Sequence, residues 1–203
     1  MANLLVVKAH PQSADNSRSV ATQDVFIQAY KESHPTDTVT VLDIFAEEVP
    51  EIDGHLLNTW ADAASQKELT TEQVATLTRF NELTEQFLDA DKIVITNALW
   101  NLSVPTRLKA WIDTIVVKGK TFRYSETGPV GLVPEKRLVH IQSNGGLYSG
   151  EEPASKYIET IFNFMGLTDI QHIFIEGVDH QPERAEEIIA KAKEKAVQIA
   201  TSF

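Results

Sequence analysis

Residues 3–19 read NLLVVKAHPQSADNSRS, a short apolar run followed by a polar stretch that opens a helix. The apolar part, residues 3–9, does not alternate between polar and apolar side chains, which is typical of a strand buried on both faces of a parallel sheet. Residues 17–30 then show a helical apolar stripe of Val20, Val25 and Phe26. The order strand, polar loop, helix predicts the start of an alternating α/β fold.

The same alternation continues to the end of the chain. Further strands are predicted at residues 38–44, 92–96, 137–142 and 169–175, and further helices at residues 70–88, from Pro105 to a stop at Gly119, at 157–165 and at 183–201. Five apolar strands separated by helices predict a doubly wound, five-stranded parallel sheet with helices on both faces. The flavodoxin-like version of this fold has strand order 2-1-3-4-5 and binds its ligand at the switch point between strands one and three.

Two segments interrupt the rhythm. Residues 46–69 are acidic, polar and rich in turn formers, and are predicted to be an excursion from the domain. Residues 121–134 are punctuated by Gly and Pro, which favours a short hairpin or a loop. With no repeat or linker elsewhere, the sequence predicts a single flavodoxin-like domain over residues 1–203.

Composition excludes several classes of protein. The net charge of −11 argues against a nucleic-acid partner, because a phosphate backbone requires a basic surface. The absence of cysteine excludes disulfides, thiolate nucleophiles and Cys-ligated metals. The six histidines lack metal-ligand spacing, so no metal site is expected. No apolar run has the length of a membrane span and the amino end lacks a secretion signal, so we expect no membrane partner and a cytoplasmic location.

Three loops follow the predicted strands one, three and four, where ligands bind in such sheets. The first contains Ser17, Arg18 and Ser19 at a helix start, which suits an anion such as phosphate, although serines there also act as ordinary helix caps. No dinucleotide fingerprint or Walker A pattern is present. The second loop has Trp100 and Asn101 between apolar neighbours, which suits a flat ring with polar edges or a core lid. The third has Gly145 and Gly146, which allow close backbone approach to a ligand or form a surface loop.

The chain resembles the FMN-dependent NADH azoreductases, which also act as NADH:quinone oxidoreductases, over essentially its whole length. The resemblance is carried by the segments NSRS at 16–19, LWNL at 99–102, PTRLK at 105–109, GKTFRY at 119–124, GP at 128–129, SNGG at 143–146 and FMGL at 164–167. It implies an enzyme that takes a hydride from NADH, or from NADPH, onto the N5 atom of FMN and reduces quinones and azo compounds in a two-electron, ping-pong second step. Family members are homodimers with two flavin sites at the subunit interface.

The resemblance also implies roles for individual residues. Ser17, Arg18 and Ser19 would hold the FMN phosphate, and residues 99–102 and 143–146 would contact the isoalloxazine ring. The full cofactor-binding set is His10, Ser17, Arg18, Ser19, Leu99, Trp100, Asn101, Leu102, Ser143, Asn144, Gly145 and Gly146. Phe122 and Tyr148 are the substrate-binding candidates, and no side chain is assigned as a catalytic acid, base or nucleophile.

The chain departs from the family at four positions. His10 follows Ala9 where many members carry a pair of serines, Ala98 replaces a frequent proline, Asn144 replaces a common arginine, and Tyr148 lies near a histidine of some members. Two other hypotheses stay open: a flavodoxin-like electron carrier without turnover of its own, and a quinone reductase that binds FAD.

Overall fold

The centre of the protein, in a computed structural model that describes residues 1–203, is a five-stranded parallel sheet. Its strands lie in the order β2-β1-β3-β6-β7, and all four pairings between neighbours are parallel. The strands are β1 (Asn3–Ala9), β2 (Thr38–Asp43), β3 (Lys92–Ala98), β6 (Arg137–Asn144) and β7 (Asp169–Glu176). The predicted order is confirmed, because β6 and β7 are the fourth and fifth strands of the sheet.

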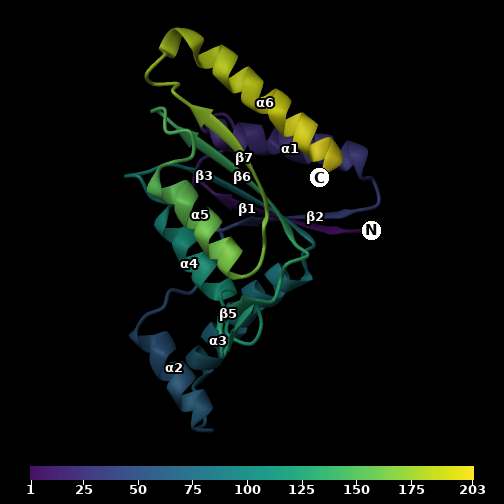
Figure 1. Ribbon diagram of the computed structural model, residues 1–203. Helices are drawn as coiled ribbons and strands as arrows, with labels where there is room; N and C mark the ends of the chain where they lie inside the picture. Colours follow the sequence, from purple (N-terminus) through teal and green to yellow (C-terminus); the bar gives the residue numbers. More distant parts are fainter.

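Helices cover both faces of this sheet. The first group, α1 (Arg18–Ser33) and α6 (Ala185–Ser202), lies on one face, and Figure 1 shows the two helices running side by side. The other face is covered by α3 (Thr71–Asp89), α4 (Thr106–Ile115) and α5 (Pro153–Phe164). Strand β3 serves both layers, since Ile93 and Ile95 pack toward α3–α5 and Val94 packs toward α1 and α6. Burial of each such side chain contributes about 1.5–3 kcal/mol.

The predicted helix starts correspond to real caps. Ser17 is the N-cap of α1, and its side chain accepts a hydrogen bond from the Val20 backbone N–H. Thr70 and Gln73 form the predicted capping box at the start of α3, each side chain bonded to the backbone of the other. Pro105 caps α4, so the helix itself begins one residue later than predicted.

The structure corrects three details of the sequence interpretation. Helix α4 ends at Ile115, not at Gly119, which has a φ of 86° in the turn that follows. Residues 46–69 contain a helix, α2 (Gly54–Ala64), capped by the Asp53 side chain; Figure 1 shows it projecting beyond the sheet beside α3. The predicted last helix starts too early, since η1 (Pro182–Arg184) is a 3-10 turn that precedes α6.

Residues 121–134 form the hairpin rather than the loop. Its strands are β4 (Phe122–Ser125) and β5 (Gly128–Gly131), which pair in antiparallel register outside the main sheet. The backbone of Val133 donates to the carbonyl of Met165, in the connection between α5 and β7. The hairpin therefore packs at the end of the sheet where β7 begins, next to the amino end of that strand.

Candidate functional site

The three predicted loops meet at one edge of the sheet. Strand β3 lies between β1 and β6, and its last residues pair with the last residues of both neighbours. From β1 the chain continues to β2 on one side of the sheet, whereas from β3 it continues to β6 on the other side. The switch point of the sheet therefore falls between β1 and β3. The backbone N–H of Leu99 donates to the carbonyl of Ser143 at 2.9 Å and joins two of the loops.

A polar cavity of about 330 Å³ lies at this switch point. Its lining residues are His10, Asn16, Ser17, Arg18 and Ser143. Four of these five residues belong to the set predicted from the sequence, and they come from the loops after β1 and β6. Asn16 was not among the predicted residues, although its place in the same loop was a sufficient signal to include it.

Ser17 and Ser19 lie at the start of α1 and form a candidate anion cradle, in which Ser17 lines the cavity and Ser19 lies behind it, outside the lining. Their side chains are almost completely buried, with exposed fractions of 6% and 0%, and their hydroxyl oxygens lie 3.2 Å apart. Ser17 is the helix cap of α1, so one of the two alternative interpretations of this serine is confirmed, and it is compatible with the other. The first-turn N–H groups of α1 have no partner within the helix, and the helix dipole places partial positive charge there. The arrangement can hold a phosphate group.

Arg18 adds positive charge beside the cradle. Its guanidinium lies 3.2 Å from a carboxylate oxygen of Asp179, and both side chains are exposed, so the pair contributes little stability. Asp179 comes from the loop after β7, a strand end that the sequence interpretation passed over. A Cβ atom on Gly145 would lie 2.2 Å from the Asp179 carboxylate, so this glycine is required for the two loops to approach each other.

His10 is a neutral hydrogen-bond donor in the cavity wall. Burial lowers the pKa of His10, and the nearby charge of Lys8 lowers it further. The Nδ1 atom accepts the backbone N–H of Gln12 at 3.1 Å, so the neutral ring carries its proton on Nε2. His10 also lies 5.5 Å from Trp100, measured between ring centroids, and so connects the loops after β1 and β3.

The loop after β3 presents apolar side chains to solvent. Trp100 and Ser103 exchange two backbone hydrogen bonds around a tight turn, in which both central residues have positive φ: 52° at Asn101 and 60° at Leu102. Backbone in this region is costly for residues other than glycine and is concentrated at binding sites. Trp100 and Leu102 remain 41% and 46% exposed. Trp100 therefore does not cover the hydrophobic core. It belongs to an exposed apolar surface next to the cradle.

The remaining residues of the loop after β6 have different positions. The Asn144 side chain is 4% exposed and donates to Glu176 at 2.9 Å, so it braces the loop from below and is not in the cavity lining. The other oxygen of Glu176 accepts the backbone N–H of Ser149. The Tyr148 ring lies over Gly146, where a Cβ atom would be 2.8 Å from the ring. Tyr148 therefore packs on the loop after β6 but is not in the cavity lining, and its role in substrate binding stays a prediction.

Phe122 lies elsewhere. It begins β4, and its ring packs 4.7 Å from Phe164 at the end of α5. The hairpin contacts the α5–β7 connection closely, since a Cβ atom on Gly131 would lie 2.2 Å from the backbone nitrogen of Gly166. This is the edge where β7 begins, opposite the edge where β1, β3 and β6 end. The structure therefore does not bring Phe122 to the other predicted residues within one chain.

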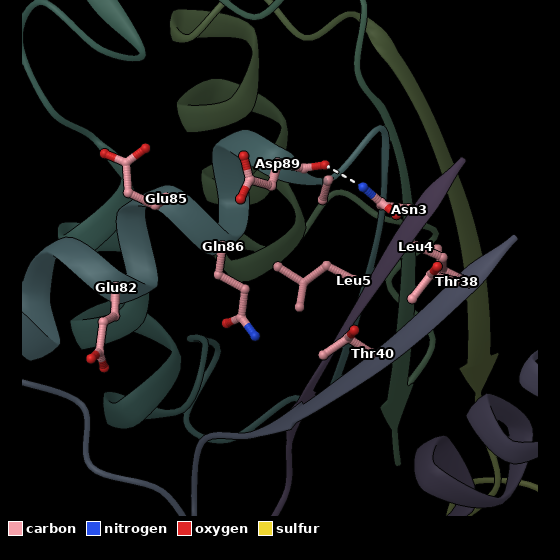
Figure 2. Close-up of a pocket in the computed structure, with 10 residues that line it drawn as sticks. Asn3, Leu4, Leu5, Thr38, Thr40, Glu82, Glu85, Gln86 and Asp89 are labelled. Carbon is pink, nitrogen blue, oxygen red and sulfur yellow. Dashed lines mark hydrogen bonds between the residues drawn. The ribbon is translucent and has the colours of Figure 1, made fainter. Parts of the chain in front are cut away.

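A second cavity, of about 480 Å³, lies away from the loops. It is lined by the first residues of β1, by β2 and by the end of α3: Asn3, Leu4, Leu5, Thr38, Thr40, Glu82, Glu85, Gln86, Asp89 and Ala90. Figure 2 shows the Gln86 side chain of α3 lying between this helix and the two strands, whereas Glu85 points away from them, and Asn3 is bonded to the backbone of Asp89. Because ligands in such sheets bind where the strands end, this cavity is not part of the candidate site.

Comparisons with known proteins agree with this geometry. The family model described as "Flavodoxin-like fold" matches residues 2–200. An FMN-dependent NADH:quinone oxidoreductase of Streptococcus suis is 45% identical over the full length of both chains. A protein of the same description from Halalkalibacterium halodurans is 43% identical, again over both full lengths.

Solved structures of azoreductases superimpose on this chain. An azoreductase from Bacillus anthracis superimposes with a TM-score of 0.92 at 38% identity, and each chain is covered completely. An FMN-dependent NADH-azoreductase from the same species, solved in complex with FMN, has a TM-score of 0.90 at 31% identity, with 98% of this chain and 100% of that chain covered. None of the helices is both long and apolar enough to cross a membrane.

Proposed function

The chain belongs to the FMN-dependent NADH:quinone oxidoreductases of flavodoxin-like fold, and we propose on this premise that it uses NADH to reduce quinones and azo compounds with bound FMN. The observation that carries the proposal is the cavity at the β1/β3 switch point, where an anion cradle adjoins an exposed apolar surface. A monophosphate with an attached flat ring has both of these parts.

The residues at the switch point fit FMN. Ser17, Ser19 and the first turn of α1 would hold the phosphate, with Arg18 adding charge at the rim. Trp100 and Leu102 would pack against the ring, and the glycines at 145 and 146 would let the backbone reach its polar edge. His10 would donate from Nε2 to an oxygen of the cofactor.

When bound, FMN supplies the two-electron acceptor and donor chemistry, so the protein needs no nucleophile of its own. The side chains bind, orient and exclude water. His10, kept neutral by burial, offers a hydrogen bond without placing a full positive charge in the site. Trp100 and Tyr148 form flat apolar walls against which first a nicotinamide and then an acceptor ring can stack.

The position of Phe122 supports a homodimer. Its hairpin lies at the sheet edge opposite the cradle, so it can face a flavin only in a second copy of the chain. Tyr124 projects from the same hairpin and is 63% exposed. We therefore assign both aromatics to the substrate wall of the partner subunit's site, as expected for a family whose sites lie at the interface.

The test is spectroscopic. The purified protein is expected to be yellow or to take up FMN, and anaerobic NADH is expected to bleach the flavin band until a quinone restores it. NADPH is added in parallel to establish the preferred donor. A protein that gains no flavin absorbance from FMN would contradict the proposal. A flavin band that neither nicotinamide bleaches would instead favour the electron carrier.

A further inference from the structure

A buried row of polar side chains runs beneath the loops after β3 and β6, on the face of the sheet covered by α5. From its inner to its outer end it consists of Ser155, Glu152, Gln142, Asn97, His140, His172 and Glu159. The five members from Ser155 to His140 are at most 3% exposed. The sequence pattern gave no sign of this row, because its members come from three strands and from α5, which only the tertiary structure brings together.

The inner contacts are short. The Gln142 amide nitrogen lies 2.5 Å from a Glu152 carboxylate oxygen, and the Asn97 amide nitrogen lies 3.0 Å from the Gln142 oxygen. The His140 Nε2 atom lies 2.8 Å from the Asn97 oxygen. The same Glu152 oxygen also accepts the backbone N–H of Ser155.

The Glu152 oxygen that accepts the backbone N–H of Ser155 also accepts from Gln142, and this contact sets the direction of the other bonds in the row. A carboxylate only accepts, so Gln142 must turn its NH₂ group toward it and its oxygen toward Asn97. Asn97 must then donate to Gln142 and accept from His140, whose Nε2 therefore carries a proton. Each of the two side-chain amides therefore has a single orientation that satisfies both of its neighbours. The donor–acceptor order of the hydrogen bonds is fixed from Glu152 as far as His140.

The histidine pair completes the row only with an extra proton. Complete burial lowers the pKa of His140 to about 3, so His140 is neutral and its Nδ1 accepts. The facing Nδ1 of His172, 3.2 Å away, must donate. The Nε2 of His172 lies 3.2 Å from Glu159 and must donate to that carboxylate. His172 satisfies both contacts only as the imidazolium.

His172 lies among groups of both signs. The pKa of His172 is lowered overall, because burial outweighs the carboxylates of Glu159 and Glu152 on α5, which raise it, and Lys195 on α6 lowers it further. When His172 loses a proton it can donate in only one of its two contacts: with the proton on Nε2 two bare Nδ1 atoms face each other, and with the proton on Nδ1 a bare Nε2 faces Glu159. A reversed row needs the proton on Glu152, because Gln142 then turns its oxygen toward that carboxyl group.

The row is connected to the loops of the candidate site. The Asn97 amide nitrogen also donates to the backbone carbonyl of Ala98, at 3.2 Å, where the loop after β3 begins. The next residue, Leu99, is bonded to Ser143 in the loop after β6. In a reversed row the Asn97 oxygen would oppose the Ala98 carbonyl, and both loops would lose this support.

We propose that His172 is a positioning residue of the FMN site, which in its protonated form completes the row at the histidine end and thereby supports the loops after β3 and β6. The proposal rests on the proposed function, because these loops are the ones assigned to the flavin. It predicts that FMN binds more tightly to the form in which His172 is protonated, although no atom of His172 touches the cofactor.

The experiment measures FMN affinity by fluorescence quenching from about pH 5 to about pH 9. The phosphate of FMN titrates near pH 6, so comparison among variants decides the outcome. Wild type is expected to lose at least about fivefold in affinity above the transition, a typical coupling between sites. Glu159→Gln is expected to move the transition to lower pH, Lys195→Gln to higher pH, and His172→Gln to abolish it; the exposed Glu151→Gln is the control.

A second readout does not involve FMN. Nitrogen-15 NMR of the histidine rings is expected to show the proton of His140 on Nε2, and the side-chain amide signal of Gln142 should shift as His172 titrates. One pH profile shared by all variants, or a Gln142 signal that ignores His172, would overturn the inference while leaving FMN binding intact. Absence of quenching at every pH would overturn the proposed function and this inference with it.

Discussion

The buried His140 makes a quantitative prediction about stability and pH. The folded protein keeps its ring neutral, with a pKa of about 3, whereas the unfolded chain takes up a proton below about pH 6.5. The unfolded state therefore binds more protons, and stability falls as the pH falls. The loss approaches about 1.4 kcal/mol per pH unit, so acidification from pH 7 to pH 5 is expected to remove about 2 kcal/mol. This window lies above the range in which Asp and Glu titrate.

Urea denaturation of the FMN-free protein at each pH measures the loss, since bound ligand would add its own pH dependence. With a slope of about 2 kcal/mol per M, the midpoint should fall by about 1 M. His140→Gln is the matched variant, because glutamine can keep a donor toward Asn97 and does not titrate. It is expected to be less stable than wild type at pH 7 but to lose about 2 kcal/mol less on acidification. Equal losses in both proteins would refute the burial of a neutral His140.

Three further predictions concern the site and the fold. Ser17→Ala combined with Ser19→Ala is expected to weaken FMN binding about a hundredfold, with the exposed Ser13→Ala unchanged; an unchanged Kd would place the phosphate elsewhere. Tyr124→Ala is expected to lower turnover, and mixing it with the double serine variant should restore activity in about a quarter of the sites, because a hybrid dimer contains one unaltered site. Without any recovery, the aromatic hairpin acts within its own chain. Thr70→Ala removes the α3 cap and should cost about 1 kcal/mol by thermal denaturation, with quinone reduction preserved.

The site divides into parts that a sequence can and cannot reveal. Ser17, Ser19 and Gly145 are local signals, since helix caps and glycines act on the few residues beside them, and their loops follow recognisable strands. The exposure of Trp100 is not local, because a tryptophan in a loop after a strand is equally suited to covering the core. The direction in which the Trp100 side chain points depends on the turn at Asn101 and Leu102, where positive φ is unusual for both residues.

The errors have the same physical origin. Gly119 is an ordinary stop signal, but α4 ends earlier, at Ile115, where the chain must turn toward the hairpin. Residues 54–64 were not expected to be helical, because their polar composition hides a helix that packs against α3 and is capped by Asp53. In both cases a tertiary contact outweighs the local preference.

The cradle shows what the sequence by itself determined. The buried run at residues 3–9, the serines that follow it and the repeated strand–helix pattern were enough to predict the parallel sheet, its order and the edge proposed to bind a phosphate, because burial periodicity and helix capping are short-range effects. Only the tertiary structure decided that Phe122 lies at the opposite edge and that Asn97, His140 and Gln142 join into one row. Those relations come from strand register and from packing between segments far apart in the chain, which no local pattern records.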